Sequence, residues 1–171
     1  ITSNLGEKID NISNYAITLS INSNIADVLK ENPTVPENTL EHFLVNSELT
    51  DQAQRIIGLH KNIYAWDILD TENHWFHSST TETDQLDSIL GPEVLDSLQT
   101  NLAFQFLGPF QISGEPTFVA LKSITNIDNT KYLGALVLLI RETNISSAFR
   151  DLPDSSSRDF YITDENGQIL S

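Results

Sequence analysis

The sequence contains neither cysteine nor methionine among its 171 residues. Without cysteine, the chain has no disulfide framework, no thiolate zinc site and no cysteine nucleophile. Because it begins at Ile1 and has no methionine at all, we expect it to be a segment of a longer protein. Its longest apolar run, Leu133–Ile140, is far shorter than the ~20 residues that a membrane-spanning helix needs. We therefore expect any membrane anchor to lie outside this segment.

Basic residues are scarce: nine lysines and arginines face 24 acidic residues, which gives a formal net charge of −15. A surface of this sign would repel phosphate backbones, so the composition argues against nucleic acid as a partner. It would also repel anionic lipid. The hydrophobic content of 39% and the charged content of 19% are typical of a globular chain with an acidic, solvated surface.

Two similar phrases, Ile68–Ser78 and Tyr161–Ser171, each read as strand, turn and strand. Each has an apolar approach, an acidic turn that contains Asn, and a second extended arm that ends in Ser. Asp, Asn and Gly tolerate the positive φ angles of tight hairpins, so each phrase predicts a β-hairpin. The second hairpin ends with the sequence. We therefore expect one complete lobe and the beginning of another.

An amphipathic helix is expected over about residues 3–30, because its apolar residues recur at steps of three and four: Leu5, Ile9, Ile12, Ala16 and Leu19. Pro33 ends it, since the residue before proline avoids the helical region. This narrow stripe leaves two interpretations open. The helix could pair with a second copy of itself in a parallel homodimer, or it could pack on its own sheet.

The remaining pattern predicts an α+β fold in which helices pack against one face of a PAS-like, five-stranded antiparallel sheet. A capping box at Asn38–Glu41 opens a second helix. We divide the chain into an N-terminal spine helix (1–36), a lobe (37–152) and a linker with the first hairpin of a second lobe (153–171). The other expected elements are a helix at 51–61, strands at 62–68 and 75–77, helices at 84–90 and 92–101, strands at 103–112, 117–125 and 133–141, and a helix at 144–152.

Four phrases resemble a known family: the Asn/Ser-rich tail Ser20–Asn24, the opening Asn62-Ile63-Tyr64, the apolar run Tyr132–Ile140, and Phe160–Ser171. With this element order, the chain resembles the extracytoplasmic Cache (PAS-like) sensor domains of bacterial transmembrane receptors. It is most similar to the double-Cache sensors of Gram-positive histidine kinases. The resemblance implies a non-catalytic, membrane-distal lobe on the extracellular side that binds a small molecule, within a two-component sensor histidine kinase.

The sequence departs from this family in one respect. Members that hold amino acids through an Arg-x-Trp-Tyr-type phrase would need it near residues 75–105, whereas no Arg occurs between Arg55 and Arg141. This argues against an amino acid held in that way.

The predicted ligand pocket lies between the sheet and its helical cover, with aromatic walls and a few orienting polar groups. The residues that we select for it are Trp66, Trp75, His77, Phe110, Phe118 and Lys122. The alternative for each aromatic residue is an ordinary place in the core. Lys122 lies in an otherwise apolar strand, so it either meets an anionic partner, which could be a ligand or a carboxylate, or lies at an exposed edge.

Other chemistry is not supported by the sequence. His74 and His77 are three residues apart on a strand and point to opposite faces, so we expect no metal site; His42 and His60 are read as packing or surface residues. No cofactor motif, phosphate loop or nucleophile elbow is present. The alternative functions are docking of a ligand-loaded solute-binding protein, the sensor domain of a chemoreceptor or cyclic-dinucleotide enzyme, and a fragment of a secreted hydrolase.

Overall fold

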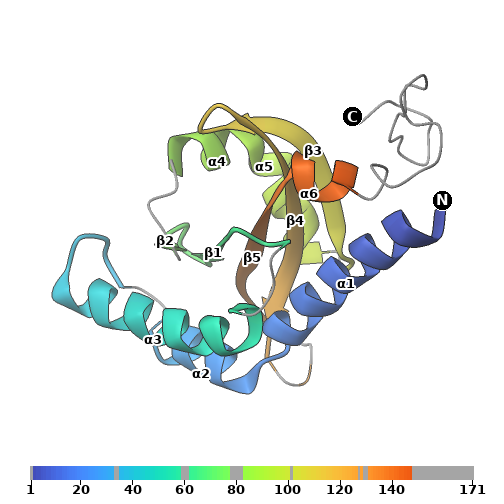
Figure 1. The fold of residues 1–171 in the computed structure, drawn as a ribbon. Helices are drawn as coiled ribbons and strands as arrows, with labels where there is room; N and C mark the ends of the chain where they lie inside the picture. Colours follow the sequence, from blue (N-terminus) through green and yellow to red (C-terminus); the bar gives the residue numbers. More distant parts are fainter. Residues whose placement is uncertain are drawn as a thin grey trace.

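The computed structural model describes residues 2–32, 35–58, 62–77, 83–100, 102–126, 128 and 131–147 (Figure 1). Helical and strand segments occur in the order that the sequence predicts, although the first three helices have other bounds. They are α1 (Thr2–Ser20), α2 (Ser23–Glu31), α3 (Leu40–Ile57), β1 (Ala65–Asp70), β2 (Trp75–His77), α4 (Thr83–Ile89), α5 (Pro92–Thr100), β3 (Gln105–Ile112), β4 (Glu115–Thr125), β5 (Tyr132–Arg141) and α6 (Glu142–Ser146).

The five strands form one antiparallel sheet in the order β2-β1-β5-β4-β3. The almost wholly apolar β5 is the central strand, as its composition suggests, and Leu133–Ile140 is buried throughout. The predicted α+β class with a five-stranded antiparallel sheet is confirmed.

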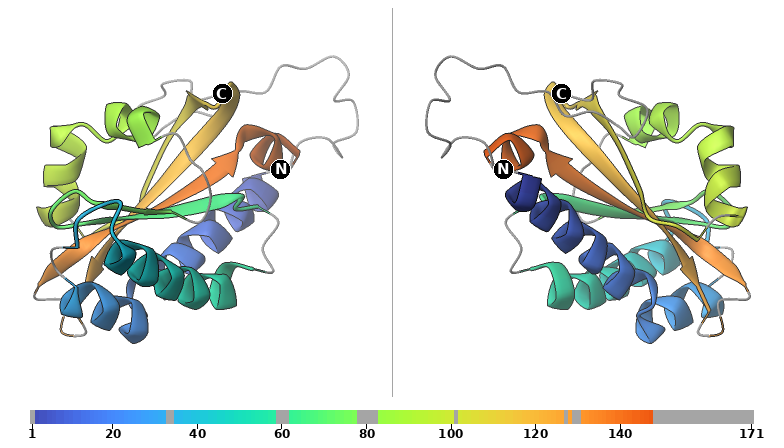
Figure 2. Two further views of the ribbon diagram at one scale, coloured as in Figure 1. Left: turned by 90° about the vertical axis from the view of Figure 1, so that its left-hand side faces the viewer. Right: turned by 90° about the vertical axis from the view of Figure 1, so that its right-hand side faces the viewer.

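Helices cover both faces of the sheet, and not one face as expected from the sequence (Figure 2). Helices α1, α2 and α3 pack on one face, where the core includes Ile12, Leu49 and Phe118. Helices α4 and α5 cover the other face, where Leu86 and Leu98 meet the sheet. Because strand side chains alternate between the two faces, β1, β4 and β5 contribute to both cores.

The predicted continuous helix over residues 3–30 is wrong, because the structure divides it into α1 and α2. Asn22 has an extended backbone, and its side-chain oxygen accepts hydrogen bonds from the backbone N–H groups of Asn24 and Ile25. This is N-capping, for which Asn is among the preferred residues. The apolar stripe continues across the break, which is why periodicity alone did not reveal it.

The separate helices expected after Thr39 and after Asp51 are one helix, α3. Thr39 caps it by accepting from the His42 N–H, and the buried side chains recur every four residues: Val45, Leu49, Ala53 and Ile57. No Gly or Pro interrupts the segment. The prediction of two separate helices was wrong here, because the buried stripe runs without a break from Val45 to Ile57.

The first predicted hairpin is confirmed, with Ile68 opposite Phe76 in the β1–β2 register. In its turn, Asn73 has φ +66°, and the Asp70 carboxylate accepts hydrogen bonds from the N–H groups of Glu72 and His74. The second predicted hairpin, His60, the linker 153–157 and the end of the helix predicted at 144–152 lie outside the described residues. Within the described part of the chain, no helix is long and apolar enough to cross a membrane.

Candidate functional site

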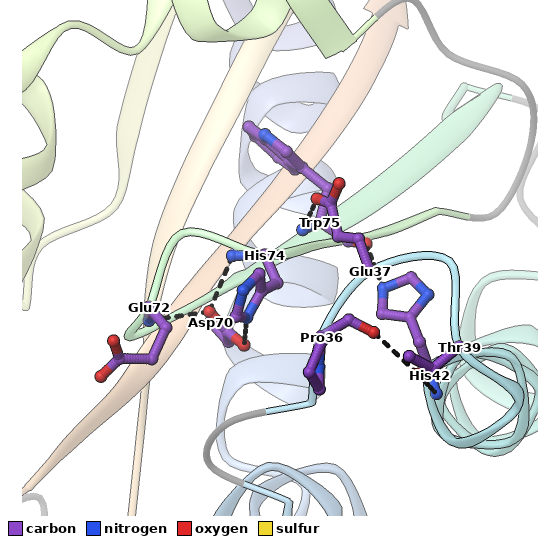
Figure 3. Close-up of polar contacts among 8 residues, drawn as sticks. All are labelled: Pro36, Glu37, Thr39, His42, Asp70, Glu72, His74 and Trp75. Carbon is purple, nitrogen blue, oxygen red and sulfur yellow. Dashed lines mark hydrogen bonds and ion pairs between the residues drawn. The ribbon is translucent and has the colours of Figure 1, made fainter.

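In the part of the chain that the structure describes, the outer edge of β2 is bonded to side chains and not to another strand (Figure 3). The Trp75 carbonyl accepts from His42 Nε2 at 3.0 Å, and the Trp75 N–H points to Glu37 Oε1 at 3.5 Å. Two residues further along β2, on the same edge, the His77 N–H donates to Asn46 Oδ1 at 2.8 Å. An unpaired strand edge invites pairing with other chains. Here His42 and Asn46 of α3, with Glu37 from the segment before it, close that edge and fix α3 to the sheet.

A cavity of about 470 Å³ lies where α3 meets β2, and we call it the α3–β2 pocket. Its volume lies within the range typical of small-molecule sites. It offers a carboxylate, amides, a hydroxyl and imidazoles beside aromatic surface. Its lining residues are Glu37, Asn38, Thr39, His42, Phe43, Asn46, Trp75 and His77.

The His77 ring at this pocket is held from beneath by a buried carboxylate. Asp67 lies directly opposite His77 in the β1–β2 register, and its Oδ1 is 2.8 Å from His77 Nδ1. The Asp67 side chain is 0% exposed and that of His77 is 24% exposed. Because a carboxylate accepts, His77 Nδ1 carries the proton in this contact, which leaves Nε2 as the ring's second polar atom.

Trp75 is held by α4, which covers the face of the sheet opposite to α3. Its indole Nε1–H donates to Asp87 Oδ1 of α4 at 2.9 Å, and its ring stacks on His77 with the centroids 5.8 Å apart. Trp75 therefore links the pocket to the core beneath α4 and α5.

A second Asp–His contact holds the hairpin turn beside the pocket. His74 Nδ1 lies 3.1 Å from Asp70 Oδ2, and Asp70 is buried. Burial raises the pKa of the nearby Tyr132 to about 12, and the negative charge of Asp70 contributes to the same shift.

The structure brings two of the six predicted pocket residues, Trp75 and His77, into this cavity. Trp66 and Phe118 are buried in the core under α1–α3, and Phe110 packs against the core on the α4–α5 face. The Lys122 amine donates to the Leu102 carbonyl, and partial burial lowers its pKa. A ligand role for any of the six remains a prediction.

Sequence reasoning missed most of the α3 side of the pocket. His42 was read as a packing or surface residue; its ring stacks on Phe76 and also bonds the β2 edge. His42 and Asn46 are four residues apart, so they share one helical face, which lies beside the buried stripe of α3. This spacing of four could have indicated that His42 and Asn46 act together, but it does not indicate which strand their helical face contacts.

A second cavity of about 520 Å³ lies between α2 and the connection from β4 to β5. It is lined by Ile21, Ser23, Ala26, Asp27, Lys30, Thr125, Asn126, Asp128 and Leu133. None of the six predicted residues is among them. In neither cavity, nor elsewhere among the described residues, do three or more potential metal-ligating side chains gather.

A scan against protein-family models finds no match, and neither does a search of curated proteins. Solved structures do match, although at low sequence identity. The ligand-binding domain of the Campylobacter jejuni chemoreceptor Tlp3 in complex with L-valine superposes with a TM-score of 0.61 at 13% identity, over 99% of this chain and 65% of that chain. The sensory domain of Tlp3 with isoleucine bound superposes with a TM-score of 0.61 at 13% identity, over 99% of this chain and 64% of that chain.

A further structure of the Tlp3 sensory domain gives a TM-score of 0.63 at 13% identity, over 99% of this chain and 66% of that chain. The chain thus spans slightly less than two thirds of the length of these sensory domains. At this identity the likeness establishes the fold alone: the chain has the fold of chemoreceptor sensory domains.

Proposed function

We propose that this chain is the extracellular, ligand-sensing part of a membrane receptor and binds a small molecule in the α3–β2 pocket. The observation that carries the proposal is the arrangement of Trp75 and His77 in a cavity of about 470 Å³, with His77 held by the buried Asp67. The hydrogen bond that one ring nitrogen of a histidine makes to a carboxylate fixes which nitrogen carries the proton, and so sets what the other nitrogen offers to a ligand. The sensory-domain fold supports the same proposal.

The pocket favours a small polar ligand with one apolar side. Glu37 and Asn46 supply acceptors, the His77 ring supplies a second nitrogen, and Phe43 and Trp75 supply aromatic surface. The carboxylate of Glu37 and the charge of −15 favour a ligand that carries an amine or another cationic group.

Signalling would use the bonds that join α3 to β2. A ligand between these elements meets His42 and Asn46, whose side chains hold the β2 edge. Its differential affinity for two positions of α3 would shift the equilibrium between them. Because α3 packs against α1 and α2 in one core, such a shift would reach the N-terminal helices.

For the full protein we propose a two-component sensor histidine kinase, in which this lobe is membrane-distal, residues 153–171 begin a second lobe and the N-terminal helices contact a second copy. A chemoreceptor is the second candidate, favoured by the solved sensory domains that share the fold. The coding sequence on both sides of the segment separates them: a kinase module after the second membrane span supports the first, and a methyl-accepting signalling module supports the second.

The binding proposal is tested by a thermal-shift screen of amines, amino acids and other small polar metabolites, followed by calorimetry on responders. Glu37→Gln removes the pocket carboxylate and His77→Gln removes the imidazole; each should weaken the binding of a cationic responder about tenfold or more. Asp27→Asn, at the second cavity, is the matched control and should leave the affinity unchanged. The proposal would be refuted if Asp27→Asn weakened the binding of a responder and the two pocket variants did not, because the site would then be the second cavity.

A further inference from the structure

The outward face of α3 carries large apolar side chains over its first two turns. Leu40, Phe43 and Leu44 occupy positions i, i+3 and i+4, which are neighbours on a helix surface. Their exposed fractions are 75%, 66% and 58%. The buried stripe that begins at Val45 lies on the opposite side of the helix. The beginning of α3 is therefore apolar on both sides.

Ile17 and Ile21 form an exposed apolar pair at the end of α1, but in the described part of the chain a group of three exposed neighbours occurs only here. Of the seven large hydrophobic residues exposed in the described part of the chain, three lie within Leu40–Leu44. Further along α3 the outward positions are polar, with Ser47, Glu48 and Asp51. Single exposed apolar residues are common on soluble proteins, but a contiguous group usually marks an interaction site.

Acidic residues lie close to the group in sequence. Glu37 and Glu41 flank its beginning and Glu48 follows one turn after Leu44, whereas residues 37–54 contain no Lys or Arg. Two copies of this surface facing each other would bring like charges together, and an anionic membrane would be repelled. The charge complement of the surface is a basic partner.

We propose that Leu40, Phe43 and Leu44, with Glu41 and Glu48, form a docking surface for an amphipathic helix of a partner protein. The partner's apolar side chains pack on the three exposed hydrophobic residues, and lysines or arginines beside them pair with the two glutamates. Helix-on-helix contact suits anchors at i, i+3 and i+4. The proposal does not depend on a small molecule in the α3–β2 pocket. Phe43 belongs both to the docking surface and to the α3–β2 pocket, so a partner bound at the first changes the wall of the second.

The test uses two synthetic helical peptides with the same leucine face, one flanked by lysines and the other by glutamates, in calorimetry against the intact chain. We expect the lysine peptide to bind at least about tenfold more tightly than the glutamate peptide. The variant L40S/F43S/L44S should weaken the lysine peptide about tenfold or more. Ile21→Ser removes an exposed apolar residue elsewhere, which is 64% exposed, and should leave the affinity unchanged.

Charge reversal makes the test sharper. In the variant E41K/E48K the preference should invert, so that the glutamate peptide binds more tightly. General attraction of a basic peptide to an acidic protein would survive in L40S/F43S/L44S, which keeps every charge; unchanged affinity there would refute the proposal. Circular dichroism should show all variants folded, because the substituted side chains are exposed.

Two other results would also overturn the proposal. A dimer seen by sedimentation that dissociates in L40S/F43S/L44S would assign the surface to a second copy of the chain. Binding to phosphatidylglycerol vesicles that is lost in the same variant would assign it to a membrane.

Discussion

Replacing Gly134 with alanine should destabilise the sheet at the point where β1 meets β5. Gly134 lies opposite Asp70 on one side and Ile124 on the other, beside an irregularity in the β4–β5 register. A Cβ added there would lie 2.5 Å from the Leu69 carbonyl oxygen and 3.4 Å from Asp70 Cα. Both are backbone atoms, so no side-chain rotation relieves the contact.

The expected cost follows from this geometry. Ordinary contact between a Cβ and a neighbouring atom begins at about 3.4 Å, so the added Cβ and the Leu69 carbonyl oxygen would have to move apart by up to about 0.9 Å. Overpacking of this kind costs about 1–3 kcal/mol, and we expect the upper half of that range because the strands are paired on both sides. For a chain of this size, that corresponds to a decrease in Tm of roughly 4–12 °C.

Urea unfolding of Gly134→Ala, followed by circular dichroism, measures the loss. The matched control is Gly6→Ala in α1, where an added Cβ meets nothing within 4 Å. Alanine in a helix interior is about 0.5–1 kcal/mol more favourable than glycine, so this variant should be more stable than the natural chain. A Gly134→Ala midpoint equal to that of the natural chain, with an unchanged urea dependence, would refute the close approach of β1 and β5.

Three further predictions concern other parts of the chain. Phe118→Ala should lower the free energy of unfolding by about 3–5 kcal/mol without a specific effect on the affinity of a pocket ligand, because Phe118 is fully buried in the core under α1–α3; calorimetry on the folded variant at low temperature tests the second part. Asn22→Ala should cost about 0.5–2 kcal/mol in urea unfolding, and Asn22→Gly only a few tenths, since Asn22 caps α2; equal losses would argue against the cap. Absorbance at 295 nm should show one tyrosine that ionises near pH 12 and disappears in Tyr132→Phe. Because the folded-state pKa of Tyr132 lies above the ordinary 10.0, its contribution to stability is complete below pH 10 and is lost between pH 10 and about 12, so an unchanged loss of stability over that interval in Tyr132→Phe would contradict the assignment.

Much of the fold could be predicted from local patterns. The apolar run of β5 indicated a strand covered on both faces, and the Asp70–Asn73 turn indicated the hairpin. Both signals depend on residues close together in the chain, where side-chain alternation and turn chemistry act directly. The break at Asn22 was also present locally, in a cap that the continuing apolar stripe concealed.

The candidate site was less predictable because its two sides are distant in sequence. Trp75 and His77 were selected from their strand, but Asn46 is 31 residues away from His77, and only packing of α3 against β2 brings them into contact. Likewise, Trp66 and Phe118 were selected from their strands, but the strand pattern did not indicate that packing of α1–α3 on the sheet would bury both side chains.

The sequence by itself determined the order of helices and strands, the acidic surface and the first hairpin, because propensity, periodicity and turn chemistry act over a few residues. Tertiary structure alone decided which helices cover which face, that α3 closes the edge of β2, and that Asp67 lies beneath His77. These contacts depend on the burial of apolar surface between segments that are distant in sequence. The pattern within any single segment does not show which other segment it will pack against.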